Sequence, residues 1–118
     1  MAQKRVWIYC RIAHQSPDND FAMTAQVRYL TEYAAKRGLP GAGVTTEYGN
    51  GLTRDRPGLK KVTDAVKNGK AEAVLVKNLS RIARSYLPMP EVVKTLNQYG
   101  AELISADEGV SLGQQEHF

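Results

Sequence analysis

The sequence has few of the residues that form disulfides or metal sites. Its one cysteine, Cys10, cannot form an internal disulfide, and its place in an apolar run predicts a buried core residue. The two histidines, His14 in a predicted loop and His117 in the tail, lack the paired carboxylate or cysteine spacing of a metal site. We therefore expect no metal ion in this protein.

Glycine-rich phosphate loops are also missing. Residues 41–43 begin like a dinucleotide fingerprint, but they precede a predicted strand, and Thr46 stands where the third glycine is required. Residues 69–70 resemble the end of a P-loop, but Asp64 occupies the position of its first glycine. We expect no cofactor.

Long apolar segments are absent as well. No run is long enough to span a bilayer, and residues 1–5 lead directly into the strand-like run 6–9, which leaves no room for a secretory signal. The chain has 118 residues, of which 42% are apolar and 24% charged, and these values are typical of one soluble globular domain. We expect a cytoplasmic protein.

The basic residues are concentrated in the middle of the chain. The net charge of +4 permits contact with nucleic acid or another polyanion without requiring it. Nine of the sixteen lysines and arginines lie between positions 54 and 84. On charge alone, a solvated basic face and an anion-binding face both remain open.

Short apolar runs alternate with helical patterns, which predicts an α/β fold with a mostly parallel sheet and helices on both faces. Strands are predicted at 6–10, 43–48, 73–77 and 102–106. The first helix is predicted from Asp20 to Gly38, the second from Asp55 to Asn68, and the third from Pro88 or Pro90 to Gly100. Their expected inner faces are Met23, Val27, Leu30 and Ala34, then Leu59, Val62 and Val66, then Met89, Val92, Val93 and Leu96. Residues 110–118 lack periodicity and are predicted to form an unstructured tail after a domain at 1–109.

Four arginines follow strands or open a helix in this scheme. Arg11 follows the first strand, Arg56 opens the second helix, and Arg81 and Arg84 follow the third strand. The carboxyl ends of parallel strands and the amino ends of the next helices meet at one edge of the sheet. Because a guanidinium donates two parallel hydrogen bonds and keeps its charge, the pattern predicts a phosphate site, with surface ion pairs as the alternative for each arginine.

A set of motifs in the same order resembles the catalytic domain of serine recombinases, the resolvase/invertase family. The motifs are Tyr9–Ala13, Gln26, Gly51, Asp55–Leu59, Val76–Arg84, Gly100–Ile104 and Asp107–Gly109. The resemblance implies DNA strand exchange through a phosphoserine link. It implies that Arg11, Arg81 and Arg84 contact the scissile phosphate and that Arg56 supports them. Gln26 and Glu47 would be secondary polar members, and Lys77 would add to the positive field.

The sequence departs from this family at the nucleophile. The serine should lie two residues after Arg11, but that position is Ala13, whose methyl group cannot attack phosphorus. Ser16 is the nearest replacement, with a turn residue before Pro17 as the alternative. After Gly109 we find no pattern for the long dimer-forming helix and DNA-binding domain of family members. We expect weak DNA binding by the chain alone, and a second copy or another recombinase subunit as partner.

Three functions remain open at this point. The first is an inactive or accessory subunit, a pseudoenzyme, in DNA recombination or mobile-element biology. The second is an active recombinase that uses another nucleophile, or in which Ala13 is itself an introduced mutation. The third is a protein-interaction or anion-binding module that keeps the fold. Salt-dependent DNA binding separates the third from the others, and a covalent DNA adduct identifies the second.

Overall fold

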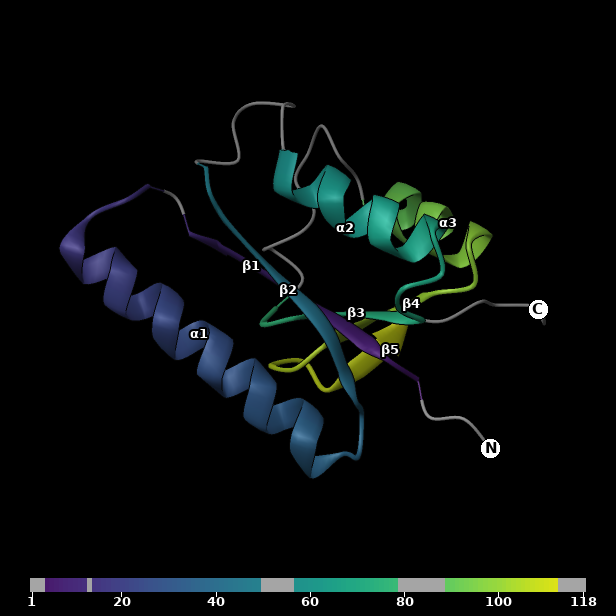
Figure 1. The fold of residues 1–118 in the computed structure, drawn as a ribbon, viewed down its shortest axis with the longest axis horizontal. Helices are drawn as coiled ribbons and strands as arrows, with labels where there is room; N and C mark the ends of the chain where they lie inside the picture. Colours follow the sequence, from purple (N-terminus) through teal and green to yellow (C-terminus); the bar gives the residue numbers. More distant parts are fainter. Residues whose placement is uncertain (1–3, 13, 50–56, 79–88, 113–118) are drawn as a thin grey trace.

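The computed structural model describes residues 4–12, 14–49, 57–78 and 89–112 (Figure 1). The elements in chain order are β1 (Val6–Ile12), α1 (Pro17–Lys36), β2 (Gly41–Tyr48), α2 (Pro57–Lys67), β3 (Ala73–Val76), α3 (Met89–Gln98), β4 (Glu102–Ser105) and β5 (Val110–Leu112). They form one sheet with the order β2-β1-β3-β4-β5. The first four strands pair in parallel and β5 is antiparallel to β4. The predicted α/β class with a mostly parallel sheet is confirmed.

Helices cover both faces of the sheet, with α1 on one face and α2 and α3 on the other (Figure 1). The two faces arise because successive side chains of a strand point to opposite sides. In β1, Ile8 and Cys10 pack with α1, whereas Trp7 and Tyr9 pack with α2 and α3. Cys10 is fully buried, as predicted. The sheet is thus buried between two apolar layers, which fits its continuous apolar strands.

The first helix begins three residues earlier than the sequence predicted. The prediction placed its start at Asp20, but α1 starts at Pro17 and Ser16 is its N-cap. The Ser16 hydroxyl accepts a hydrogen bond of 3.1 Å from the backbone N–H of Asn19. Proline suits the first helical turn because it has no N–H to satisfy there. The serine and proline that were interpreted as a turn are therefore a helix start.

The other helix predictions agree with the structure where it describes them. The predicted inner faces are buried or half-buried from Met23 to Ala34 in α1, from Leu59 to Val66 in α2 and from Val92 to Leu96 in α3. Gly69 and Gly100 end α2 and α3 with φ angles of 75° and 80°, a conformation that favours glycine. The predicted start at Asp55 lies outside the described residues, as does the side chain of Met89.

The prediction of an unstructured tail from residue 110 is wrong for its first three residues. Val110, Ser111 and Leu112 form β5 and pair with Ser105, Ile104 and Leu103 of β4. Three residues are too few to show a periodic pattern, so this strand depends on its partner rather than on local sequence. Residues 113–118 lie outside the described part of the chain.

Neither a membrane-spanning helix nor a metal site is found in the described ranges. No described helix is long and apolar enough to cross a bilayer. Among the same residues, no group of three or more histidine, cysteine, aspartate or glutamate side chains could hold a metal ion.

Candidate phosphate-binding site

The predicted site falls only partly within the described structure. Ala13, Arg56, Arg81 and Arg84 lie outside the described residues. The structure places the four other predicted members, which are Arg11, Gln26, Glu47 and Lys77.

Arg11 lies within β1, one residue before its end, and beside Glu47 of β2 in the strand register. The sequence predicted that this strand ends at residue 10 and that Arg11 follows it, but pairing with β2 extends β1 to Ile12. It is a buried cation, with 3% of its surface exposed. Its Nη1 donates a hydrogen bond of 2.6 Å to the backbone carbonyl of Gly49, just after β2. A buried charge requires hydrogen-bond partners of this kind. The guanidinium is thereby held at the edge where the sequence predicted phosphate binding.

Glu47 joins three elements at this edge. One carboxylate oxygen accepts a hydrogen bond from the Tyr9 hydroxyl of β1, and the other accepts one of 2.6 Å from the backbone N–H of Gly58 in α2. A carboxylate at the first turn of a helix satisfies a free N–H and interacts favourably with the helix dipole. Glu47 therefore fixes the start of α2 against the sheet.

Gly58 is required for this contact. A Cβ at position 58 would lie 2.8 Å from Cδ and 2.9 Å from Cβ of Glu47. Such distances are shorter than ordinary van der Waals contact, so a side chain would displace the carboxylate. We define Tyr9, Arg11, Glu47 and Gly58 as the Glu47 corner.

Gln26 projects from α1 and is 4% exposed. Its Oε1 is buried without a hydrogen-bond partner. The side chain lines a hollow of about 340 Å³ between α1 and the sheet, together with Ile12, Ala22, Ala25, Tyr29 and Lys77. Buried polar atoms are normally paired, so this oxygen is an acceptor available to a donor that enters the hollow.

Lys77 follows β3 and forms an ion pair with Asp107, with 3.0 Å between Nζ and Oδ2. Asp107 also accepts hydrogen bonds from Tyr29 of α1 and from Asn78. Burial raises the pKa of the Asp107 carboxyl, but hydrogen bonds from Lys77, Tyr29 and Asn78 lower it more, so the net pKa is below its usual value. The hydrogen bond to Asp107 raises the pKa of Tyr29. Part of the Lys77 charge is thus neutralised by Asp107.

The four placed residues lie at the same edge but on two faces of the sheet. Arg11 shares the face of Tyr9, which packs with α2 and α3, because the two are separated by two positions in one strand. Gln26 and Lys77 lie with Ile12 on the face covered by α1. The structure therefore groups Arg11 with Glu47 and groups Gln26 with Lys77. A phosphate that contacts both groups has to lie across the edge of the sheet.

Two members of this edge were not identified as functional residues from the sequence. Asp107 lies in a motif that supported the family resemblance, but its pairing with Lys77 joins positions 30 residues apart and leaves no local pattern. The bond of Tyr9 to Glu47 spans 38 residues. A tyrosine in the apolar run 6–10 was the available signal, because a buried hydroxyl needs a partner.

Comparisons with known proteins agree with this architecture. The family model described as the resolvase N-terminal domain matches residues 6–117. A resolvase family site-specific recombinase from Streptococcus pneumoniae has a similar structure, with a TM-score of 0.80 and 22% identity over 95% of this chain and 78% of that one.

Two further solved structures are similar. The C-terminal catalytic domain of ISC1926 TnpA, an IS607-like serine recombinase, has a TM-score of 0.77 and 26% identity over 86% of this chain and 68% of that one. The N-terminal catalytic domain of TP901-1 integrase has a TM-score of 0.78 and 24% identity over 92% and 82%. The fold is thus that of serine recombinase catalytic domains. The chain belongs to the resolvase N-terminal domain family.

Proposed function

We propose that this chain is a DNA-recombination domain that binds a phosphodiester at the carboxyl edge of its sheet but does not transfer strands itself. In this proposal it acts as an inactive or accessory recombinase subunit. The observation that carries the proposal is the placement of Arg11. A buried guanidinium is held at the end of β1, two residues before the position that would hold the nucleophile.

The chemistry explains why position 13 decides activity. A serine Oγ attacks phosphorus, the bond from phosphorus to one sugar oxygen breaks, and that oxygen leaves as a hydroxyl after gaining a proton. Fixed positive charge stabilises the phosphoryl oxygens during this step. The methyl side chain of Ala13 has no oxygen with which to form the new bond. By analogy with other covalent enzymes, loss of a nucleophile lowers the rate by about a million-fold.

The described hydroxyl groups near position 13 do not favour a replacement nucleophile. The Ser16 hydroxyl caps α1 through its hydrogen bond from Asn19. Tyr9 is fully buried and donates its hydroxyl hydrogen bond to Glu47. Attack by either group would first require the loss of a structural hydrogen bond.

Covalent adduct formation on short nicked duplex DNA tests the proposed deficiency. The natural chain and an Ala13→Ser variant should be compared on denaturing gels. We expect no adduct from the natural chain and a trace of adduct from Ala13→Ser, because the variant regains the missing oxygen. An Ala13→Ser, Arg81→Ala, Arg84→Ala variant is the control and should lose that trace. Adduct and recombined DNA from the natural chain would show that the central claim is wrong.

Anion binding tests the other half of the proposal. We expect chemical-shift changes at Arg11 and its neighbours when phosphate or short DNA is added, because the guanidinium donors do not depend on a hydroxyl at position 13. An Arg81→Ala, Arg84→Ala variant should respond less. An equal response from this variant would place the binding elsewhere on the molecule.

A further inference from the structure

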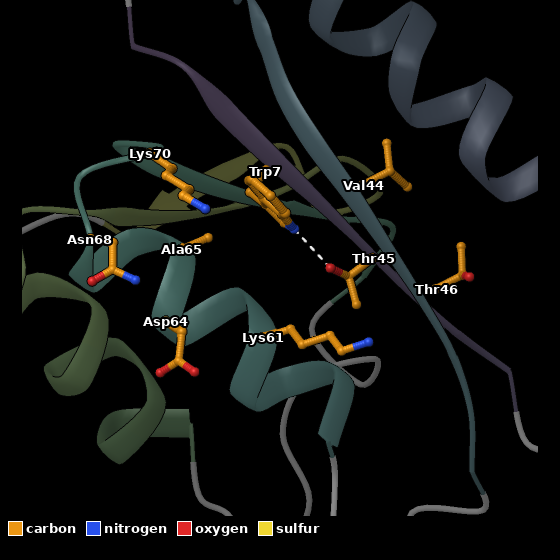
Figure 2. A pocket seen from close by; sticks show the side chains of 9 residues that line it. All are labelled: Trp7, Val44, Thr45, Thr46, Lys61, Asp64, Ala65, Asn68 and Lys70. Carbon is orange, nitrogen blue, oxygen red and sulfur yellow. Dashed lines mark hydrogen bonds between the residues drawn. The ribbon is translucent and has the colours of Figure 1, made fainter.

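A second hollow, of about 520 Å³, lies between β2 and the carboxyl-terminal half of α2. Its size is within the roughly 300–1,000 Å³ range of small-molecule sites. Figure 2 shows β2 on one side of it, α2 on the other and Trp7 of β1 between them. The lining residues are Trp7, Val44, Thr45, Thr46, Lys61, Asp64, Ala65, Asn68 and Lys70. We call it the Trp7 hollow.

The indole of Trp7 is fixed in place on the sheet. Its Nε1 donates a hydrogen bond of 2.8 Å to Oγ1 of Thr45. Its six-membered ring lies against Gly43, where a Cβ would be 2.4 Å from Cη2 of the indole. The absence of a side chain at position 43 therefore allows the ring to lie over β2. A planar aromatic surface held in this way is a suitable platform for stacking.

The polar side chains around the indole are not paired with one another. In the described part of the chain, Lys61, Asp64, Asn68 and Lys70 make no side-chain hydrogen bond or ion pair, whereas Lys4 and Lys77 each pair with a carboxylate. Two cations, one amide and one carboxylate are thus available to a ligand in one hollow. Figure 2 shows the Lys70 ammonium directed toward the indole, whereas Lys61 lies in α2 with its ammonium pointing away from Lys70.

We propose that the Trp7 hollow binds a nucleotide, with the base stacked on the indole and the phosphate bound by Lys70, while Lys61 adds positive charge at the other end of the hollow. Each part of that ligand has a partner of suitable chemistry. Indole rings stack on bases, ammonium groups bind phosphate, and amide and carboxylate groups hydrogen-bond to base edges. The carboxylates of an acidic peptide would use the lysines, but they do not stack on an indole as a base does, so the nucleotide is the better fit.

This site is separate from the edge that holds Arg11. Trp7 precedes Arg11 by four positions in β1, which corresponds to about 13 Å along an extended strand. None of the residues that line the Trp7 hollow belongs to the proposed phosphate-binding edge. The inference therefore goes beyond the proposed function and does not require it to be correct.

Trp7 is the one tryptophan in the sequence, so its fluorescence reports directly on the hollow. The probes are AMP, adenosine, inorganic phosphate and a single-stranded ten-nucleotide DNA. We expect AMP to cause a saturable change in Trp7 emission. Adenosine and inorganic phosphate should each cause a smaller change, because adenosine lacks the phosphate group and inorganic phosphate lacks the base. A change with the DNA alone would also support the site and would identify a DNA strand as the source of the nucleotide. No change with any probe, or an equal change with phosphate or adenosine, would overturn the proposal.

Matched charge variants distinguish a site from general electrostatic attraction. Lys61→Gln with Lys70→Gln removes two cations that line the hollow, and Lys60→Gln with Lys67→Gln removes two exposed cations of α2 that do not line it. The first pair should raise the Kd for AMP, or for the DNA if it alone binds, by roughly tenfold or more, because the phosphate of the ligand loses its hydrogen bond to a charged ammonium group. The second pair should leave the Kd nearly unchanged. An equal loss in both pairs would overturn the proposal.

An arginine variant tests whether the two regions are independent. Arg81→Ala with Arg84→Ala should leave the response of Trp7 to the bound probe unchanged, whatever happens to phosphate binding at the carboxyl edge. Loss of the Trp7 response in this variant would overturn the assignment of the nucleotide to the hollow.

Discussion

The Glu47 corner and the Trp7 hollow are formed by the same three elements, β1, β2 and α2, but they differ in how their polar groups are paired. In the corner, the Glu47 carboxylate accepts two hydrogen bonds and Arg11 donates to Gly49. In the hollow, four polar side chains have no such partner in the described structure. Paired groups hold a fold together, whereas unpaired exposed groups contribute little to stability and are available for binding. Substitutions should therefore lower stability in the corner and affinity in the hollow.

Glu47→Ala should have the largest effect on stability. It removes the acceptor of the Tyr9 hydroxyl and of the Gly58 N–H, and hydrogen bonds to a carboxylate are worth more than neutral ones. We expect the free energy of unfolding to fall by about 3 kcal/mol in a urea titration. Glu32→Ala, at an exposed position of α1, is the control and should change it little. A small effect of Glu47→Ala would show that the corner is not a structural anchor.

Gly43→Ala should have the next largest effect and links stability to the hollow. The new Cβ would lie within 2.7 Å of three atoms of the indole, so Trp7 has to move. We expect a loss of about 2 kcal/mol, together with a changed Trp7 emission spectrum and weaker nucleotide binding. Gly41→Ala is the matched control in the same strand, because nothing lies within 4 Å of its Cβ position. An unchanged spectrum in Gly43→Ala would contradict the inferred position of the ring.

Gly58→Ala should cost about 1 kcal/mol. The contact with Glu47 is unfavourable by up to about 3 kcal/mol, but alanine has a higher helix propensity than glycine by about 1 kcal/mol and offsets part of it. Thermal unfolding followed by circular dichroism measures the difference. A double variant with Glu47→Ala should show a smaller penalty at position 58, because the contact with the carboxyl group is gone while the contact with the Cβ of position 47 remains. An unchanged penalty would show that the carboxyl group is not its cause.

Lys61→Gln and Lys70→Gln should have the smallest effect on stability. Neither ammonium has a hydrogen bond or ion pair in the described structure, so we expect each change to stay within about 0.5 kcal/mol. The same urea titration as for Glu47→Ala gives a direct comparison. A loss above about 1 kcal/mol would mean that these lysines support the fold, and the contrast between corner and hollow would fail.

The start of α1 and the presence of β5 show where local sequence was insufficient for the fold. Ser16 and Pro17 suit both a turn and a helix start, and the N-cap hydrogen bond to Asn19 selects the second. β5 contains three residues and exists through its pairing with β4. By contrast, α2 has a regular apolar spacing and a terminal Asn68-Gly69, so its inner face and its end could be predicted.

The candidate site was predictable in its position but not in its arrangement. The predicted order of parallel strands places Arg11 and Lys77 at the carboxyl edge of the sheet, where the structure also has them. Arg11 and Gln26 lie on opposite faces of the sheet. The pairing register of the strands decides which side chains face α1, and local sequence does not specify that register.

The sequence by itself determined the α/β order of elements, the buried faces of the helices and the arginine at the end of β1. These properties follow from periodicity and from the residues that start and end helices, and both are local. Tertiary structure alone decided the Glu47 bridge from Tyr9 to Gly58 and the fixed indole of Trp7 over Gly43. Those contacts join residues that are separated in the chain, and they form because neighbouring strands pair in one register and bring those residues together.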